Sequence, residues 1–213
     1  MHIAVKASDG QKKDILAKGI PAGIYVQWLG SDEPLPGVAA DAYFDFLFSN
    51  EFMATNDFIT TKPVFVNAVA CTLKDIGYTN YARINGWSGF FEGKTLEVAA
   101  VDNGKTAAEG ILNALGWKFV WAPDEPGLIA ARVVIMIINE AYFGLADGIS
   151  TKKEIDIAMK LGTNHPYGPF EWAEKVGLKN IYFLLKKLQQ QYGNRYNVAP
   201  LLEQEAKTNG IIA

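Results

Sequence analysis

The first 121 residues alternate between short apolar runs and segments with helical spacing, with turn residues between them. Short runs of β-branched and aromatic residues are typical of strands, whereas apolar residues three and four positions apart are typical of helices. Such alternation predicts an α/β domain with a largely parallel sheet. Helices are predicted at residues 9–18, 71–76 and 106–115, and strands at residues 3–5, 24–29, 43–48, 63–68, 81–84, 96–99 and 117–121.

No good strand pattern follows Pro126, and the rest of the chain has helical spacing. Residues 127–145 are apolar on nearly all sides, which is typical of a helix buried at the centre of a helical domain. We therefore expect two domains, an α/β domain at residues 1–123 and an all-α domain at residues 126–213. Further helices are predicted at residues 151–161, 179–192 and 200–207.

Glycine and proline mark a junction between two helices of the second domain. Gly162 is expected to end the helix at residues 151–161 in the left-handed conformation, which costs glycine less than other residues. Pro166 disfavours the helical conformation at His165. The next helix should begin at Pro169, because proline in the first helical turn loses no needed hydrogen bond.

Composition and charge narrow the class of protein. The chain of 213 residues is 49% hydrophobic and carries a formal net charge of −3, which predicts a folded protein with no electrostatic preference for nucleic acid. The N-terminus is too short and too quickly charged for a signal peptide, and the apolar stretch at residues 128–146 contains Arg132, Asn139 and Glu140, which disfavours a membrane span. A cytoplasmic location is the default expectation.

Three motifs of the second domain carry a family resemblance. These motifs are PGLI at 126–129, NEA at 139–141 and a helix junction with KLG at 160–162 and GPFE at 168–171. Their order and spacing, over roughly residues 126–205, resemble the C-terminal domain of 3-hydroxyacyl-CoA dehydrogenases. The resemblance implies a reduced Rossmann-like domain for NAD before a helical domain that forms a homodimer, an acyl-CoA site between the domains and a role in fatty-acid or related acyl-CoA metabolism.

The resemblance also locates the NAD-binding turn, directly after the first strand. A glycine-rich turn lets the backbone approach the pyrophosphate at a helix N-terminus. Ala7, Asp9 and Lys12 stand at the family's three glycine positions, and the chain contains no Gly-x-Gly. The charge of Asp9 should repel a pyrophosphate, so we expect Ser8 or Asp9 to cap the helix instead. Asp32 is a candidate for the ribose contact, with a solvated turn carboxylate as the alternative.

The family oxidises a hydroxyl with a histidine base that a glutamate orients. Glu97, in KTLEV at 94–98, matches that glutamate, and the family's spacing places Asn85 at the histidine position. An amide cannot accept a proton near neutral pH. Ala131 stands at the position of a family asparagine, and Ala70 lies near that of a substrate-contacting serine. Glu97 is therefore the one catalytic position that the resemblance retains.

Three of the singled-out side chains also have ordinary structural interpretations. His165 could face a cleft between the domains and pair with Glu97, or it could be an ordinary turn residue. Glu97 itself could be an exposed strand carboxylate. Cys71, the single cysteine, excludes an internal disulfide and is expected to be a small buried hydrophobe. No metal-ligand spacing connects it with the two histidines.

Three functional hypotheses remain open at this point. The first is a degenerate relative of the dehydrogenases that has lost the NAD-dependent reaction and has at most a ligand-binding role for an acyl-CoA or another small molecule. The second is an active NAD-dependent 3-hydroxyacyl-CoA oxidoreductase with an altered cofactor site. The third is a non-catalytic subunit that pairs through its helical domain with a true dehydrogenase.

Overall fold

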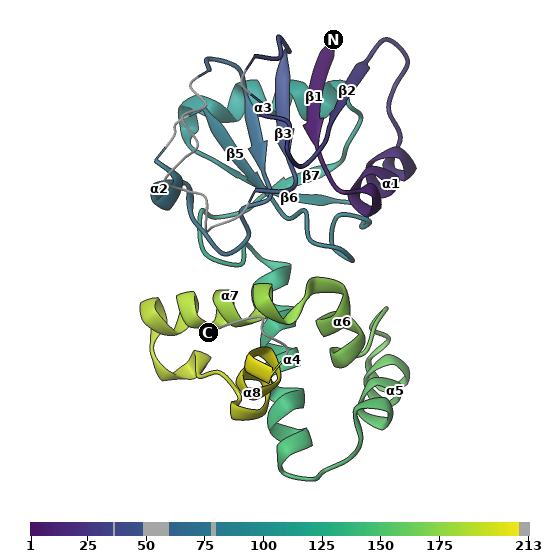
Figure 1. Ribbon diagram of the computed structural model, residues 1–213, viewed down its shortest axis with the longest axis vertical. Helices are drawn as coiled ribbons and strands as arrows, with labels where there is room; N and C mark the ends of the chain where they lie inside the picture. The colour runs from purple at the N-terminus through teal and green to yellow at the C-terminus, as the bar shows by residue number, and fades with distance from the viewer. Residues whose placement is uncertain (36, 49–59, 78–79, 209–213) are drawn as a thin grey trace. The chain divides into compact units, whose positions relative to one another are not determined.

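The computed structural model describes residues 1–35, 37–48, 60–77 and 80–208. The chain divides into two compact units, Met1–Ile129 and Ala130–Ala213 (Figure 1). The division falls a few residues after the junction expected at residues 123–126. The first unit contains the strands, and the second unit contains only helices and their connections over its described residues.

Over the described residues, the first unit is built on one seven-stranded sheet with the order β2-β1-β3-β4-β5-β6-β7. All neighbouring strands run parallel except β5 and β6, which are antiparallel. The predicted α/β fold with a largely parallel sheet is confirmed. The strands are β1 (His2–Lys6), β2 (Tyr25–Leu29), β3 (Ala42–Asp45), β4 (Val64–Val66), β5 (Tyr81–Ile84), β6 (Leu96–Ala100) and β7 (Phe119–Trp121).

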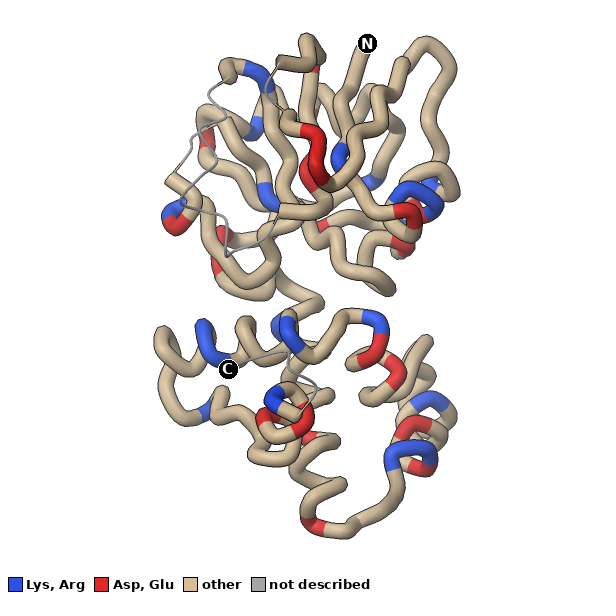
Figure 2. Tube along the Cα trace, in the orientation of Figure 1, with Lys and Arg blue, Asp and Glu red and all other residues tan. Residues whose placement is uncertain are grey.

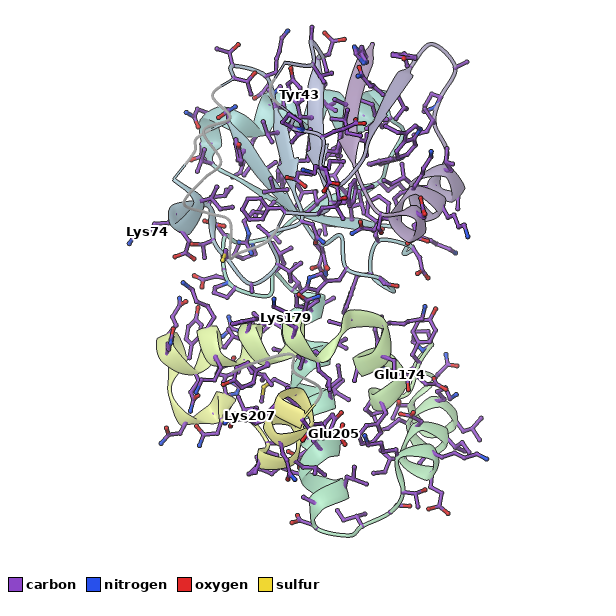
Figure 3. All side chains as sticks on the ribbon, in the orientation of Figure 1. Tyr43, Lys74, Glu174, Lys179, Glu205 and Lys207 are labelled. Carbon is purple, nitrogen blue, oxygen red and sulfur yellow. The ribbon has the colours of Figure 1, made fainter. Side chains whose placement is uncertain are left out.

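Apolar layers cover both faces of the sheet. On one face, helices α1 (Asp9–Lys18) and α3 (Asp102–Ala114) bury apolar side chains against the strands, and on the other face the short helix α2 (Leu73–Ile76) does so. Tyr43 donates from its hydroxyl to the carbonyl of Val38 at 2.7 Å, which holds the loop before β3 on this second face (Figure 3). The first core contains Ile3, Val5, Ile15, Phe44, Phe65, Ile84, Leu96, Leu112 and Trp117.

Several elements of the first unit differ from their predicted bounds by one or two residues, and two of them differ by more at one end. The strand predicted at residues 43–48 ends at Asp45, because the Asp45 carboxylate accepts a hydrogen bond from the amide of Leu47 and turns the chain. The helix predicted at residues 106–115 begins four residues earlier, at Asp102. Its polar first turn carries no apolar periodicity, and an ion pair between Lys105 and Asp102 stabilises it.

The second unit is organised around the helix α4 (Ala130–Ala146). This helix begins at Ala130 rather than at residue 127, because Gly127 and Leu128 have φ values of 85° and 50°, which no α-helix contains. Acidic and basic residues are interspersed along α5, as they are along α1 (Figure 2). The other helical elements are α5 (Lys152–Thr163), α6 (Pro169–Val176), α7 (Leu178–Tyr192), η2 (Asn194–Tyr196) and α8 (Pro200–Thr208).

The prediction that Gly162 ends α5 is wrong. The helix continues to Thr163, and Asn164 takes the left-handed conformation with a φ of 54°. Asparagine is the residue that most often replaces glycine in this role, because its short polar side chain tolerates the conformation. Pro169 does begin α6, with Gly168 as its N-cap, as predicted.

No helix in the described part of the chain is long and apolar enough to cross a membrane. The longest apolar helix, α4, buries Ile135, Ile138 and Tyr142 in the helical core.

Candidate functional site

The carboxyl ends of β1, β3, β4 and β5 meet at one edge of the sheet and define the first candidate site. Strand β1 leads to β2 on one side, and the chain then returns to place β3 on its other side. In open α/β sheets, ligands bind outside the carboxyl ends of the strands at such a reversal of strand order. Lys6 and Asp45 are register partners at this point, and Asn67 and Asn85 follow the ends of β4 and β5.

The turn between β1 and α1 is closed by the chain's own side chains. Ser8 is the N-cap of α1, and its hydroxyl accepts a hydrogen bond from the amide of Gln11 at 3.3 Å. The Gln11 side chain accepts one from the amide of Ser8 at 3.0 Å and donates to the carbonyl of Phe46 at 3.0 Å. The prediction that Ser8 or Asp9 caps this helix is confirmed for Ser8, and Asp9 lies exposed in the first turn.

Asp45 is a buried carboxyl at the end of β3, and it was not singled out from the sequence. Burial raises its pKa to about 6, while the charge of Lys6 and the amides of Leu47 and Phe48 oppose that shift. Its side chain therefore takes up a proton at a higher pH than an exposed aspartate does. An acidic residue at a strand end gives no sequence signal of this kind, because its burial depends on neighbouring strands.

A chain of hydrogen bonds ties the loops at this edge together. The Asn67 amide nitrogen donates to the carbonyl of Phe46 at 3.3 Å, and its oxygen accepts from the amide of Gly86 at 2.9 Å. Gly86 must be glycine here, because an added Cβ would come within 2.9 Å of both Asn67 and Phe46. Together with the bond from Gln11 to Phe46, these contacts link the segments that follow β1, β3, β4 and β5.

Asn85 and Glu97 are brought together, as the resemblance predicts for these two positions. The antiparallel register of β5 and β6 pairs Ile84 with Val98, so the residue after β5 stands opposite Glu97. The Asn85 amide nitrogen donates to Glu97 Oε2 over a long 3.4 Å, and the amide of Ile129 donates to the same oxygen at 3.2 Å. Glu97 is half-buried and bonded, so it is not simply an exposed strand carboxylate.

The geometry of this pair defines what it can do chemically. The nitrogen of Asn85 faces the carboxylate, and its buried oxygen accepts no hydrogen bond from any described residue. The pair can therefore orient a donor group, but it offers no imidazole to accept a proton.

Arg83 is a buried charged residue with a structural role that the sequence did not indicate. Its guanidinium forms an ion pair with Asp124 and donates to the carbonyls of Ala68 and Val69. Asp124 also accepts from the amide of Leu73 at 2.9 Å, which begins α2. These contacts hold the segment after β7 against the sheet. The signal is invisible in the sequence, since the partners lie far apart along the chain.

The remaining predicted candidates are dispersed. Asp32 is exposed in the turn after β2 and accepts a hydrogen bond from the Ser31 hydroxyl at 3.2 Å. Cys71 is buried, as predicted. Ala131 is buried in the first turn of α4, and His165 lies half-buried between α5 and α6. The suggested pairing of His165 with Glu97 stays a prediction, because the two belong to different units.

The NEA motif of the helical unit has a structural role at Asn139. This buried side chain donates to the carbonyl of Asn197 at 2.9 Å and accepts from the amide of Ala199 at 2.9 Å. The Asn197 carbonyl and the Ala199 amide, both just before α8, therefore have a partner on α4, and that segment is held against the helix.

The KLG and GPFE motifs lock the junction of α5 and α6. Lys160 forms an ion pair with Glu171, whose second oxygen accepts from the amide of Gly168 at 2.9 Å. The buried Asp156 accepts from the amide of Phe170 at 2.8 Å. A Cβ on Gly168 would collide with Asp156, so only glycine fits. The motif therefore encodes a helix junction rather than a catalytic group.

A groove of about 630 Å³ in the helical unit is the second candidate site. It follows one face of α4 and is walled by α5 and by the η2 segment. The two ends of this face are Arg132 and Gly144. The lining residues are Arg132, Val133, Met136, Ile137, Glu140, Ala141, Gly144, Ile149, Ile155, Met159, Pro169, Arg195 and Tyr196.

The fold matches solved dehydrogenases over nearly the whole chain. FadB2 from M. tuberculosis superposes with a TM-score of 0.76, covering 97% of this chain and 93% of that one at 13% identity. (S)-3-hydroxybutyryl-CoA dehydrogenase PaaH1 from Ralstonia eutropha gives a TM-score of 0.74, covering 98% and 94% at 16% identity. The chain therefore shares the fold of these two proteins, a Rossmann-like α/β unit followed by a helical unit.

Sequence comparison shows what the helical unit is similar to. Residues 127–211 match the 3-hydroxyacyl-CoA dehydrogenase C-terminal domain. The E. coli K12 3-hydroxyadipyl-CoA dehydrogenase is 40% identical over 115 residues, which are 53% of this chain and 24% of that protein. The Clostridioides difficile 3-hydroxybutyryl-CoA dehydrogenase is 39% identical over 87 residues, 40% of this chain and 31% of that protein.

Residues 127–211 are therefore similar to the C-terminal domain of 3-hydroxyacyl-CoA dehydrogenases, as the motifs of the helical unit predict. The chain aligns with about a quarter to a third of the length of these two curated relatives.

Proposed function

We propose that this protein is a 3-hydroxyacyl-CoA dehydrogenase-like protein of acyl-CoA metabolism that no longer performs the NAD-dependent oxidation and has at most a ligand-binding role. The observation that carries the proposal is the contact between Asn85 and Glu97. Oxidation of a hydroxyl by hydride transfer requires a group that takes the hydroxyl proton. The Asn85 amide occupies that place beside Glu97 and has no pKa that would let it act as a base.

The turn after β1 supports the same proposal, because it does not fit a dinucleotide. The first turn of α1 contains the exposed carboxylate of Asp9 where a pyrophosphate would need glycine and backbone amides. The amide of Gln11 is already bonded to Ser8, and the Gln11 side chain reaches across to Phe46. We therefore derive no chemical step from NAD at this site.

The subunit hypothesis has one specific observation in its favour. Ile157 and Leu161, one turn apart on α5, are 43% and 83% exposed. Apolar side chains at this spacing are suited to packing against another helix. Pairing of the helical unit, with a second copy or with a true dehydrogenase, would bury them.

Calorimetric titration of the purified full chain with NADH, and separately with acetoacetyl-CoA, tests the proposal. An active 3-hydroxybutyryl-CoA dehydrogenase under the same conditions serves as the positive control. We expect no saturable heat with NADH. Saturable binding of NADH in the micromolar range would favour the active oxidoreductase instead, and co-purification with a full-length dehydrogenase would favour the subunit.

A further inference from the structure

We propose that two copies of this chain pair through strand β2, so that their sheets join edge to edge across a two-fold axis at Gln27. The contact lies wholly within the first unit. It is therefore independent of the proposed loss of oxidation and of any pairing through the helical unit.

Strand β2 stands at one end of the described sheet and pairs there with β1 alone (Figure 1). Dinucleotide-binding sheets with the strand order 3-2-1-4-5-6 have a further strand beyond the second one. Here the chain returns from β2 to place β3 on the far side of β1 instead. The outer edge of β2 therefore has no strand partner among the described residues.

The backbone groups at this outer edge belong to Val26 and Trp28. The amide of Tyr25 donates to the carbonyl of Met1 at 2.9 Å, so Tyr25 directs its backbone groups toward β1. The direction of hydrogen bonding alternates along a strand, so the next odd-numbered residues also face β1, and Val26 and Trp28 face away from it. Outward amides and carbonyls at a sheet edge are a template for another strand.

The sequence of β2 carries none of the features that protect an edge strand. Protected edges are very short or contain charged residues, proline or a bulge. The opposite end of the described sheet, β7, is three residues long and directly follows Lys118. The five residues of β2, YVQWL, include no charge and no proline, and they pair with β1 in unbroken register.

A second copy is the partner that this sequence fits, because β2 is complementary to itself in the antiparallel direction. With Gln27 on the two-fold axis, each Val26 stands opposite Trp28 of the second copy. These are the residues with outward backbone groups, so each pair exchanges two backbone hydrogen bonds. An aromatic residue opposite a β-branched residue is also a favourable cross-strand pair. Because the strand is uncharged, no like charges meet across the axis, as a self-complementary contact requires.

The size of the contact predicts a reversible dimer. One strand of five residues from each copy is a small interface by the standard of stable dimers. Two aromatic side chains add contact area on opposite faces of the sheet: Tyr25, which is 64% exposed, and the half-buried Trp28, whose ring lies 5.0 Å from the Lys12 ammonium. We expect a dimer that dissociates on dilution in the micromolar range.

Cross-linking of the purified full chain through an engineered cysteine tests the register. The Cα atoms of a non-hydrogen-bonded antiparallel pair are about 4.5 Å apart, which a disulfide can span. Gln27→Cys should therefore form a covalent dimer on oxidation with diamide, as seen by non-reducing electrophoresis. In Tyr25→Cys the two thiols would be about 14 Å apart at 3.4 Å per residue, so little dimer should form. The wild-type protein is the negative control, because its single cysteine, Cys71, is buried.

The comparison with Tyr25→Cys excludes random encounters. Tyr25 is exposed and Gln27 is half-buried, so collisions between unpaired molecules would cross-link Tyr25→Cys more readily. Preferential cross-linking at Gln27 supports the two-fold pairing. No cross-linking of Gln27→Cys, or an equal or greater yield from Tyr25→Cys, would overturn the proposal.

Charges at the axis give a second test that does not rely on a disulfide. Gln27→Lys and Gln27→Glu each place two like charges opposite one another, so each should weaken self-association about two- to fivefold in sedimentation velocity. An equimolar mixture of the two variants should restore it, because opposite charges then meet. Circular dichroism equal to that of the wild-type protein shows that both variants fold. Self-association of the single variants at wild-type strength, or a mixture that associates no better than they do, would place the contact elsewhere and contradict the proposal.

Discussion

At the residue scale, the polar groups of the sheet edge have environments that their sequence neighbours do not determine. Asp45 is buried by adjacent strands, and Asn85 is positioned by Glu97 from β6. Both features depend on strand register, which brings together residues far apart in the chain. The resemblance anticipated the Asn85 and Glu97 pair, whereas nothing in the sequence marked Asp45 or Arg83.

Asp45 makes the stability of the first unit depend on pH. Burial raises its pKa from an ordinary 3.8 to about 6, so the folded state binds the proton more tightly than the unfolded chain. The stability that this tighter proton binding gives the folded state is complete below pH 4 and is lost as the pH rises through about 6. The unfolding free energy changes by about 3 kcal/mol over that range. Asp45→Asn should remove this dependence and raise stability at pH 7, as measured by urea denaturation between pH 4 and 7.

Asp41 supplies a control of the opposite sign. A hydrogen bond from the amide of His2 lowers its pKa, so Asp41→Asn should weaken the protein at neutral pH rather than stabilise it. If Asp45→Asn also destabilises the protein at pH 7, burial is not the dominant influence on Asp45.

Asn139 predicts a large local effect in the helical unit. Asn139→Ala leaves the amide of Ala199 and the carbonyl of Asn197 without their buried partner. Each unsatisfied group costs roughly 1–3 kcal/mol, so the unfolding free energy should fall by about 2–6 kcal/mol. The neighbouring Glu140→Ala, at an exposed position of the same motif, should change it by less than about 0.5 kcal/mol. Similar urea midpoints for the two variants would contradict this role.

At the element scale, most helices and strands follow from local pattern, and the exceptions have local causes. Capping by Ser8 and the proline start of α6 are encoded within a few residues, and both were predicted. The end of β3 and the left-handed Asn164 were not, because a side-chain hydrogen bond and an asparagine replace the expected signals. Glu205 of α8, labelled in Figure 3, accepts hydrogen bonds from Lys152 of α5 and from the Tyr142 hydroxyl of α4, so one carboxylate joins three helices.

Two glycines of the motif between α5 and α6 should respond in opposite directions. Gly162 is helical with open space around it, so Gly162→Ala should stabilise the protein by about 0.5–1 kcal/mol. Gly168 packs against Asp156, so Gly168→Ala should destabilise it by about 1–3 kcal/mol. Thermal unfolding of both variants checks the pair. Stabilisation by Gly168→Ala, or destabilisation by Gly162→Ala, would refute the described junction.

At the scale of the whole molecule, the fold and the similarity of the helical unit to 3-hydroxyacyl-CoA dehydrogenases could be predicted from the sequence, whereas the proposed loss of activity depends on single side chains. The hydrophobic pattern predicts an α/β unit followed by a helical unit, and the solved structures that superpose on the chain have the same order. The motifs of the helical unit are explained by junctions and hydrogen bonds, so they report ancestry and folding. They do not by themselves require catalysis.

The most direct test is the oxidation of NADH by acetoacetyl-CoA, followed at the nicotinamide absorbance band with the purified full chain. The proposed loss of the base at Asn85 predicts no turnover above the rate without protein, and Glu97→Gln should be indistinguishable from wild type. Turnover that Glu97→Gln abolishes would contradict the account and show that the chain is an active dehydrogenase.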